Sequence, residues 1–468
     1  MVKACVIAGT HSGCGKTSVS LGLMAALRGR GLRVQPFKVG PDFIDPGHHA
    51  RAAGLDPQTQ SGHNLDGWML APDTVREIFA RYARGADAAV VEGVMGLFDG
   101  FSAQDDAGST TQIAKLLGLP VILVVDARSM ARSAAALVAG FAGFDPDLSL
   151  AGVIFNNVGS DNHANILTEA MAHALPEIPV LGCLRRDEEL QAPSRHLGLV
   201  TAEDCCGDEA DRYGRLGRWV EEGLDLDALL SILADLEPPG IRERGEHVVR
   251  ARIGVARGPA FCFYYRENLR LLEAAGAEIV PFSPLDDREL PPDLDGLYFG
   301  GGYPELRAFD LAQNTSMRKQ VARFARSGRP VYAECGGFMY LMDSLDDTGG
   351  RTFPMTGLFP FRAAMGKRFA ALGYREVRLL RGCPLGPSGT VVRGHEFHYS
   401  FLHEPPGELP DGLAAVYAVA DRRGPTSEPE GWLTGNALGS YIHLHFGSNP
   451  EVARHFVDSC ATSRDEAD

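Results

Sequence analysis

Short apolar runs alternate with amphipathic helical patterns along the first half of the chain. The runs predict β-strands at residues 32–37, 88–91, 121–125, 152–155 and 180–183. Helical periodicity separates them, as at residues 74–84 and 109–117. This alternation predicts a parallel sheet covered by helices on both faces, with ligands binding at the carboxyl ends of the strands.

The pattern changes after Asp204. Residues 213–236 predict one or two helices, a Pro- and charge-rich linker follows at residues 237–247, and a strand at residues 252–256 opens a second α/β pattern. The chain is therefore an α/β protein with two main domains. Its predicted divisions are a first domain at 1–204, a helical segment and linker at 205–250, a second domain at 251–460 and a polar tail at 461–468.

A glycine-rich turn joins the first apolar run, residues 4–8, to a helical pattern at residues 18–27. Such a turn can aim backbone N–H groups at a phosphate, while a lysine reaches the outer phosphates and a hydroxyl binds Mg²⁺. The loop departs from the strict P-loop pattern because Thr10 stands where that pattern has glycine. The predicted ATP-binding residues here are Gly13, Gly15, Lys16 and Thr17.

Charged and amide side chains stand near the ends of the other predicted strands. Carboxylates beside a P-loop commonly hold Mg²⁺ directly or through water. Asp42 and Glu92 are therefore predicted metal ligands, together with the hydroxyl of Thr17. Helix capping or loop solvation is the alternative for the acids, and a simple turn is the alternative for the amide. The candidates are Lys38, Asp42, Asp45, Asp66, Glu92 and Asn156.

The strongest signal in the second half is Cys335, which follows an apolar strand at residues 330–333 and precedes an apolar helix at residues 339–342. A nucleophile on a sharp strand-to-helix turn, flanked by glycines, has the elbow arrangement of acyl-transfer enzymes. We expect the helix N-terminus to lower the pKa of the thiol. The alternative is a buried and inert cysteine.

The base of such a thiol lies elsewhere in the sequence, and His443 and His445 are the candidates. Because they would share one face of a strand, spacing alone does not choose between them. Gly301, Gly302 and Gly336 are the predicted oxyanion donors. His395 and His398 also suggest zinc, but their spacing would place them on opposite faces of a strand.

Composition narrows the function class. The formal net charge of −15 argues against a nucleic-acid-binding protein. Nine cysteines without a CxxC pair favour reduced thiols, and neither a leader nor an apolar run of membrane-spanning length is evident. The sequence thus predicts a cytoplasmic protein without a membrane or nucleic-acid partner, and it leaves a homodimer open.

These motifs together resemble the cobyrinic acid a,c-diamide synthase family, which amidates corrin side chains in cobalamin biosynthesis. The first half resembles dethiobiotin-synthetase-like P-loop ligases through THSGCGKT, QPFKVGPDFID, HNLDGWML, VVEGVMGLFDG and APSRHLGL. The second half resembles class I glutamine amidotransferases through AFCFYYRENL, FSPLDD, GGGYPE, ECGGFMYL, GHEFHYS and GSYIHLHF. The P-loop alone is unspecific, whereas FKVGPDFID, GVMGLFDG and FCFYYRENL on one chain are highly specific.

The resemblance implies a role for each half. Cys335 would take the γ-amide of glutamine and release ammonia, with His443 as its base; in the wider class a Glu follows that His by two positions, where this chain has His445. Lys16, Thr17 and Lys38 would handle ATP and Mg²⁺. The remaining roles are carboxylate activation at Mg²⁺ for Asp42, Asp45 and Glu92, a weaker metal or substrate contact for Asp66, and adenine binding for Asn156.

The implied reaction turns the a and c acetate carboxylates of cobyrinic acid into acyl phosphates that ammonia attacks, with a path leading from Cys335 to the P-loop. Hydrogenobyrinic acid and nickel-sirohydrochlorin are alternative substrates that the sequence does not separate, and cobyric acid synthase fits the motifs less well. A partitioning-type ATPase is the remote alternative, because such proteins carry an extra lysine early in the loop, where this chain has His11 and Ser12.

Overall fold

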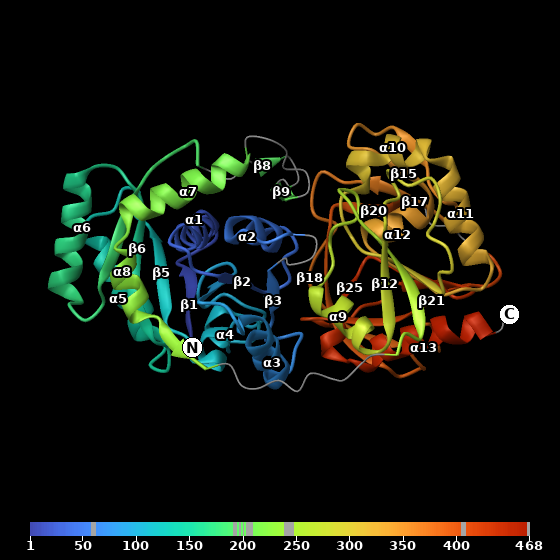
Figure 1. Cartoon of the computed structure of the whole chain (residues 1–468), viewed down its shortest axis with the longest axis horizontal. Coiled ribbons are helices and arrows are strands. Elements are labelled where there is room, and N and C mark those ends of the chain that lie inside the picture. The colour runs from blue at the N-terminus through green and yellow to red at the C-terminus, as the bar shows by residue number, and fades with distance from the viewer. Residues whose placement is uncertain are drawn as a thin grey trace. The chain divides into compact units, whose positions relative to one another are not determined.

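The computed structural model describes residues 1–57, 62–190, 194–195, 198–199, 201–202, 209–237, 248–403 and 409–465 (Figure 1). It divides into two compact units, Met1–Arg242 and Glu243–Asp468. Most of the predicted linker at residues 237–247 and part of the APSRHLGL segment lie outside the described residues. No helix in the described part of the chain combines the length and the apolar character needed to cross a membrane.

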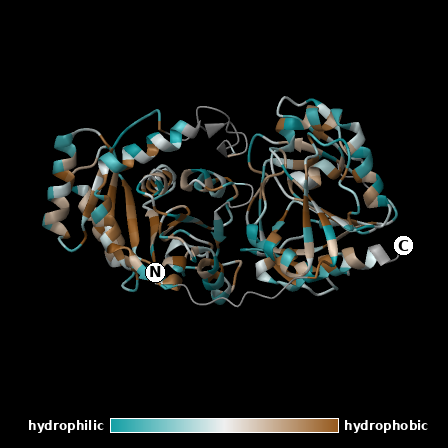
Figure 2. Ribbon diagram, in the orientation of Figure 1, coloured by the Kyte–Doolittle hydropathy of each residue, from teal (hydrophilic) through white to brown (hydrophobic). Residues whose placement is uncertain are grey.

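A parallel sheet forms the centre of the first unit, as the alternating pattern predicted. Its strands are the most hydrophobic part of the unit (Figure 2), because both faces of the sheet are covered. The order in space is β3 (His63–Leu65), β2 (Val34–Val39), β4 (Ala88–Glu92), β1 (Val2–Gly9), β5 (Val121–Asp126), β6 (Leu150–Val158) and β7 (Val180–Arg185). Strand order therefore reverses beside β1, where open α/β sheets bind their ligands.

Helices connect these strands. Gly22 lets α1 pack closely on α7, because a Cβ at this position would lie 2.5 Å from Val220 and 2.7 Å from the carbonyl oxygen of Leu216 (Figure 1). The helices of this unit are α1 (Lys16–Gly29), α2 (Asp45–Ala53), α3 (Pro72–Ala83), α4 (Thr110–Leu117), α5 (Ser133–Phe144), α6 (Asp161–Ala174), α7 (Glu209–Gly223) and α8 (Leu226–Ile232).

The helical prediction for residues 213–236 is wrong at its end. Ala234–Leu236 forms strand β10, which pairs antiparallel with the start of β1, with Val2 opposite Leu236. A three-residue strand carries too little periodicity to be told from the end of a helix. A further pair of short strands, β8 (Ser194–Arg195) and β9 (Gly198–Leu199), forms a separate two-stranded sheet.

The second unit also begins with parallel strands and then changes to antiparallel ones. The order of its larger sheet is β12 (Ala277–Phe282), β11 (Ala251–Ala256), β13 (Gly296–Phe299), β14 (Val331–Glu334), β24 (Ala437–Ser440), β23 (Glu430–Thr434), β21 (Leu413–Asp421), β18 (Ala371–Leu379), β19 (Val391–His398) and β25 (His443–Leu444), with β22 (Gly424–Pro425) beside β21. A smaller sheet has the order β16 (Thr352–Pro354), β15 (Met342–Asp346), β17 (Phe359–Met365) and β20 (Ser400–His403).

Its helices are α9 (Arg266–Ala274), α10 (Ala308–Gln313), α11 (Thr315–Arg326), α12 (Gly336–Leu341) and α13 (Glu451–Asp465), with short 3₁₀ turns η1 (Pro304–Arg307) and η2 (Phe446–Ser448). Helix α12 begins directly after Cys335, earlier than predicted, and Met342 already belongs to β15. Helix α13 continues past Cys460 to Asp465.

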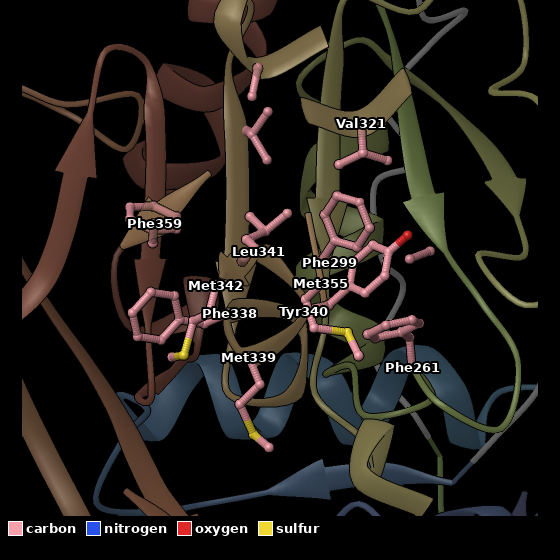
Figure 3. Close-up of a cluster of buried hydrophobic side chains, with 14 of the residues drawn as sticks. Phe261, Phe299, Val321, Phe338, Met339, Tyr340, Leu341, Met342, Met355 and Phe359 are labelled. Atoms are coloured by element: carbon pink, nitrogen blue, oxygen red, sulfur yellow. The ribbon is translucent and has the colours of Figure 1, made fainter. Parts of the chain in front are cut away.

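An aromatic and methionine-rich core holds α12 between the two sheets of this unit. Figure 3 shows Phe338, Met339 and Tyr340 of α12 surrounded by Phe261, Phe299 and other buried side chains. Phe338 lies edge-on to Phe359 of β17, with 5.2 Å between the ring centroids. This packing fixes the turn that carries Cys335.

Replacing Phe359 with alanine tests that core. Because the ring is fully buried, we expect Phe359→Ala to destabilise the second unit by about 3–5 kcal/mol. The matched control is Phe309→Ala, since Phe309 is 55% exposed and should change stability by less than about 0.5 kcal/mol. Urea unfolding followed by tryptophan fluorescence measures both, and equal midpoints would contradict the assignment of this core.

Candidate functional sites

The glycine-rich loop after β1 forms a tight turn into α1. Gly13 and Gly15 have positive φ angles of 83° and 98°, which favour glycine. A Cβ on Gly15 would also lie 2.0 Å from Nδ2 of Asn156. The ammonium of Lys16 donates to the carbonyl oxygens of His11 and Met95, so the lysine lies along the inside of the loop.

A buried ion cluster joins the carboxyl ends of β2 and β4. Nζ of Lys38 lies 2.6 Å from Oδ2 of Asp45 and 2.8 Å from Oε1 of Glu92. The hydroxyl of Thr17 donates to the same Oε1 at 2.7 Å. Four predicted site residues from distant parts of the first half are thus brought together.

Opposing effects set the charge states in this cluster. Burial alone would raise the pKa of Glu92, but Lys38 and His49 hold that pKa below its ordinary value. Burial raises the pKa of Asp45 to about 7, with Asp42 adding to the effect and Lys38 opposing it. Burial lowers the pKa of Lys16, whereas the charges of Asp45 and Glu92 outweigh burial at Lys38 and raise its pKa.

His49 is a member of the cluster that the sequence analysis missed. Its Nε2 lies 2.5 Å from Oε2 of Glu92, and both side chains are fully buried. His49 follows Asp45 by four residues on α2, so both lie on one helix face. That spacing beside a predicted acid is the signal that could have identified it.

The other predicted acids have local hydrogen bonds. Oδ1 of Asp42 accepts from the backbone N–H groups of Ile44 and Asp45, which matches the capping alternative. Oδ1 of Asp66 accepts from the N–H groups of Trp68 and Met69. These contacts fix the backbone on the β2 and β3 side of the site.

Asn156, near the end of β6, holds the P-loop. Its Nδ2 donates to the carbonyl oxygen of Cys14 at 3.0 Å, and its Oδ1 accepts from the N–H of Asn157. The side chain therefore supports the turn around Gly15. Its adenine contact stays a prediction.

Cys335 lies on a strained turn in the second unit. Its φ of 45° and ψ of −105° are unusual for a side chain with a Cβ, and such strain is typical of functional turns. The N–H of Cys335 donates to the carbonyl oxygen of Ser440 on β24, while its own carbonyl accepts from Met339 within α12. The neighbouring strand and the helix thus hold the elbow in place.

The expected lowering of the thiol pKa is wrong. Burial raises the pKa of Cys335 and the charge of Glu305 raises it further, whereas the N–H of Gly336 opposes the shift only in part. The six-residue helix α12 does not outweigh these effects. Cys335 is therefore a neutral thiol at rest, and a base has to remove its proton before it can act as a nucleophile.

The glycines near the elbow differ in their backbone contacts. The N–H of Gly301 donates to the carbonyl oxygen of Phe263 at 3.2 Å, so the fold already engages this predicted oxyanion donor. A Cβ on Gly336 would lie 3.0 Å from the backbone nitrogen of Gly302, which places these two glycines side by side. A Cβ on Gly301 would lie 2.4 Å from Cε1 of His443, so the imidazole covers this glycine.

The two candidate bases have different surroundings. His443 pairs with His395 across β25 and β19, and their rings stack at 5.0 Å. Nδ1 of His445 accepts from the N–H of Gly447, and burial lowers the pKa of His445 to about 3. His445 is therefore a neutral, structural side chain, while His443 lies against the glycine loop.

His395 and His398 both lie on β19 and have separate partners. Nδ1 of His395 lies 2.6 Å from the hydroxyl of Tyr265, and Nε2 of His398 lies 2.7 Å from Oε1 of Glu396. Within the described residues, no group of three or more His, Cys, Asp or Glu side chains is arranged to hold a metal ion.

Glu305, in the 3₁₀ turn η1 that follows the glycines at residues 300–302, gives the second unit a pH-dependent stability. Burial raises the pKa of Glu305 to about 7, so the folded unit favours its protonated form. Stability from this group is complete below about pH 4.5 and is lost as the pH rises to about 7. Between pH 4.5 and pH 8, we expect the free energy of unfolding of Glu305→Gln to fall by about 3 kcal/mol less than that of the unaltered protein. Urea unfolding at the two pH values measures this difference.

The control for this experiment is Glu273→Gln on α9, which replaces an exposed carboxylate in the same unit. This variant should keep the pH dependence of the unaltered protein. An identical pH dependence in Glu305→Gln would contradict the buried, protonated state of Glu305.

Comparisons with known proteins identify a family domain in each half of the chain. Residues 5–200 match the CobQ/CobB/MinD/ParA nucleotide binding domain, and residues 252–451 match the CobB/CobQ-like glutamine amidotransferase domain. The chain is 49% identical to a cobyrinate a,c-diamide synthase of Syntrophotalea carbinolica, covering 97% of this chain and 98% of the relative. It is 44% identical to the enzyme of that name from Salmonella typhimurium, covering 97% of each chain.

A hydrogenobyrinate a,c-diamide synthase of Streptomyces coelicolor is 43% identical, covering 98% of this chain and 97% of the relative. Relatives under both names thus span nearly the whole chain, with a nucleotide-binding half followed by an amidotransferase half. The resemblance seen in the motifs is confirmed, and the chain belongs to the cobyrinate and hydrogenobyrinate a,c-diamide synthase family.

Proposed function

We propose that this protein uses ATP and glutamine to amidate the a and c acetate carboxylates of cobyrinic acid in cobalamin biosynthesis. One observation carries the proposal. A single chain combines the P-loop cluster around Lys38 with the Cys335 elbow, over nearly the full length of relatives named for this reaction. Hydrogenobyrinic acid is the second candidate substrate because one relative carries that name, and nickel-sirohydrochlorin is a third.

The second unit supplies ammonia. His443 removes the proton of the Cys335 thiol, and the sulfur attacks the γ-carbonyl carbon of glutamine. The backbone N–H groups of Gly302 and Gly336 stabilise the oxyanion. The C–N bond then breaks, ammonia leaves with the proton from His443, and water hydrolyses the glutamyl thioester to glutamate.

The first unit activates the acceptor acid. A carboxylate does not react with ammonia because its leaving group would be oxide, so the γ-phosphoryl group of ATP is first transferred to it. Lys16 and Lys38 neutralise charge on the phosphates, and Asp42, Asp45 and Asp66 orient the acetate side of the site. Ammonia attacks the acyl phosphate and phosphate leaves.

The oxygen atoms of Thr17 and Glu92 fit Mg²⁺, a hard cation that is held by one or two carboxylates together with substrate phosphates and water. Oγ1 of Thr17, directly after the P-loop lysine, lies 2.7 Å from Oε1 of Glu92. Bound Mg²⁺ would neutralise charge on the ATP phosphates. Thr17 and Glu92 would hold it, with Asp42 as a further ligand.

We place the protein in the cytoplasm because the described cysteines are all free, as expected in a reducing compartment. We also propose a homodimer, which would cover the apolar surface of α5. Phe144 at the end of that helix is 72% exposed, and most of the helix is alanine, glycine and other apolar residues.

Removing the nucleophile separates the two halves of the reaction. We expect Cys335→Ala to lose amidation driven by glutamine while ammonium salts still support it, because the ligase site is unchanged. The matched variant Lys16→Ala should lose amidation from either nitrogen source. Product formation by liquid chromatography measures both, and failure of ammonium to support Cys335→Ala in a folded protein would contradict separate sites.

The substrate follows from a direct comparison. With ATP, Mg²⁺ and glutamine present, we expect kcat/KM to be highest for cobyrinic acid among cobyrinic acid, hydrogenobyrinic acid and nickel-sirohydrochlorin. A higher kcat/KM for either of the other two macrocycles would identify that macrocycle as the substrate instead of cobyrinic acid. ATP hydrolysis without amidation of any of the three would contradict the proposed function.

A further inference from the structure

We infer that Glu334, the residue directly before the nucleophile, is the positioning residue of His443. The inference rests on the proposed glutaminase function and names the group that replaces the Glu expected two residues after the histidine. That place holds His445, whose burial keeps it neutral. The acid comes instead from the end of β14, on the same turn as Cys335.

The distance and burial of the pair support this role. Oε2 of Glu334 lies 3.5 Å from Nδ1 of His443, and the two side chains are 1% and 2% exposed. In such a dry site a carboxylate beside one ring nitrogen strongly favours a proton on that nitrogen. The proton on Nδ1 leaves the lone pair on Nε2.

The Cε1 corner of the imidazole faces Gly301, and Nε2 lies slightly nearer to this glycine than Nδ1 does. A Cβ on Gly301 would lie 2.4 Å from Cε1 and 3.1 Å from Nε2 of His443. Gly302, the next residue, lies against Gly336, which directly follows Cys335. Holding the proton at Nδ1 therefore leaves Nε2 to take the thiol proton on the side of the elbow.

Three hydrogen-bond donors fix the carboxylate of Glu334. Its Oε1 accepts from the hydroxyl of Tyr332 at 2.6 Å and from the N–H of Leu444 at 3.1 Å, and its Oε2 accepts from the hydroxyl of Tyr298 at 3.2 Å. Burial, with the charge of Glu334 adding to it, raises the pKa of both tyrosines well above the ordinary value. The hydroxyls stay protonated, and the carboxylate has a single orientation toward His443.

The neighbouring histidines do not supply the same interaction. Nδ1 of His395 is paired with the hydroxyl of Tyr265, and burial lowers the pKa of His395 well below its ordinary value. Nδ1 of His445 accepts from the N–H of Gly447. Both rings are neutral, so neither can stabilise the imidazolium that forms when His443 takes the thiol proton.

Glu334→Gln tests the inference because glutamine keeps the size of the side chain and an oxygen acceptor for the tyrosines. Its amide removes the negative charge and can donate to Nδ1, which favours the tautomer with the proton on Nε2. The corresponding change in a Ser–His–Asp triad costs about 10⁴-fold in kcat. We expect glutaminase kcat to fall by about 10²–10⁴-fold, with KM for glutamine within about threefold.

Two further readouts separate positioning from a structural role. Alkylation of Cys335 by iodoacetamide should slow in Glu334→Gln, because fewer thiolates form, whereas amidation with ammonium salts should equal that of the unaltered protein. Tyr332→Phe is the matched control, since it removes one donor to Glu334 but keeps the charge, and its glutaminase kcat should fall by less than about tenfold.

Glutaminase kcat in Glu334→Gln within twofold of the unaltered protein would overturn the inference. If this variant loses ammonium-dependent amidation as well, Glu334→Asp decides, because it keeps the charge but withdraws it by one methylene from His443. A glutaminase loss of tenfold or more supports the inference, and a loss below tenfold overturns it. An unaltered protein that releases no ammonia from glutamine would instead refute the proposed function.

Discussion

The contact between Lys38 and its two acids governs the arrangement of the nucleotide-binding unit. An ammonium group taken out of water loses several kcal/mol of solvation, so it stays charged only where opposite charges surround it. Asp45 and Glu92 surround Lys38 from α2 and β4. Since Glu92 also contacts Thr17 and His49, the P-loop, α2 and the two strands form one electrostatic unit. Moving any one of these elements would leave a buried charge unpaired.

The amidotransferase unit uses a buried acid in the same place, at the end of a parallel strand. Glu92 ends β4 and Glu334 ends β14. The difference lies in the partners. Glu92 contacts a lysine, a histidine and a hydroxyl, which suits a site for phosphates, whereas Glu334 is surrounded by tyrosines and one histidine.

The sequence was sufficient to predict the site residues whose positions depend on where the parallel strands end. Lys38 and Glu92 could be placed together because parallel strands end at one edge of a sheet, and Cys335 because a strand, a glycine turn and a helix follow one another. His49 was missed because its contact depends on how the short helix α2 docks on α1 and β2, although its four-residue spacing from Asp45 was a signal for it. The antiparallel strands of the larger sheet in the second unit are not separated by crossover helices, so their order could not be predicted from an alternation of strands and helices.

The direction of the thiol pKa shift was predicted wrongly for a related reason. A sequence shows the helix that follows Cys335, but it does not show how deeply the thiol is buried or that Glu305 lies near it. The engagement of the Gly301 N–H with Phe263 is equally invisible, because it joins segments that are far apart along the chain. Sequence motifs indicate which residues form a site. Burial and hydrogen bonding then determine the charge of each side chain and which backbone N–H groups remain available.

The position of Glu334 follows from the alternation of side chains along a strand. Tyr332 and Glu334 lie on one face of β14, and Tyr298 lies opposite Tyr332 on β13. Cys335 follows on the turn, where its positive φ leads the chain into α12. Ser440 pairs with Glu334 on β24, so the chain that follows brings His443 back toward the acid. The acid at the end of β14 therefore lies beside Nδ1 of His443, and position 445 holds a neutral ring.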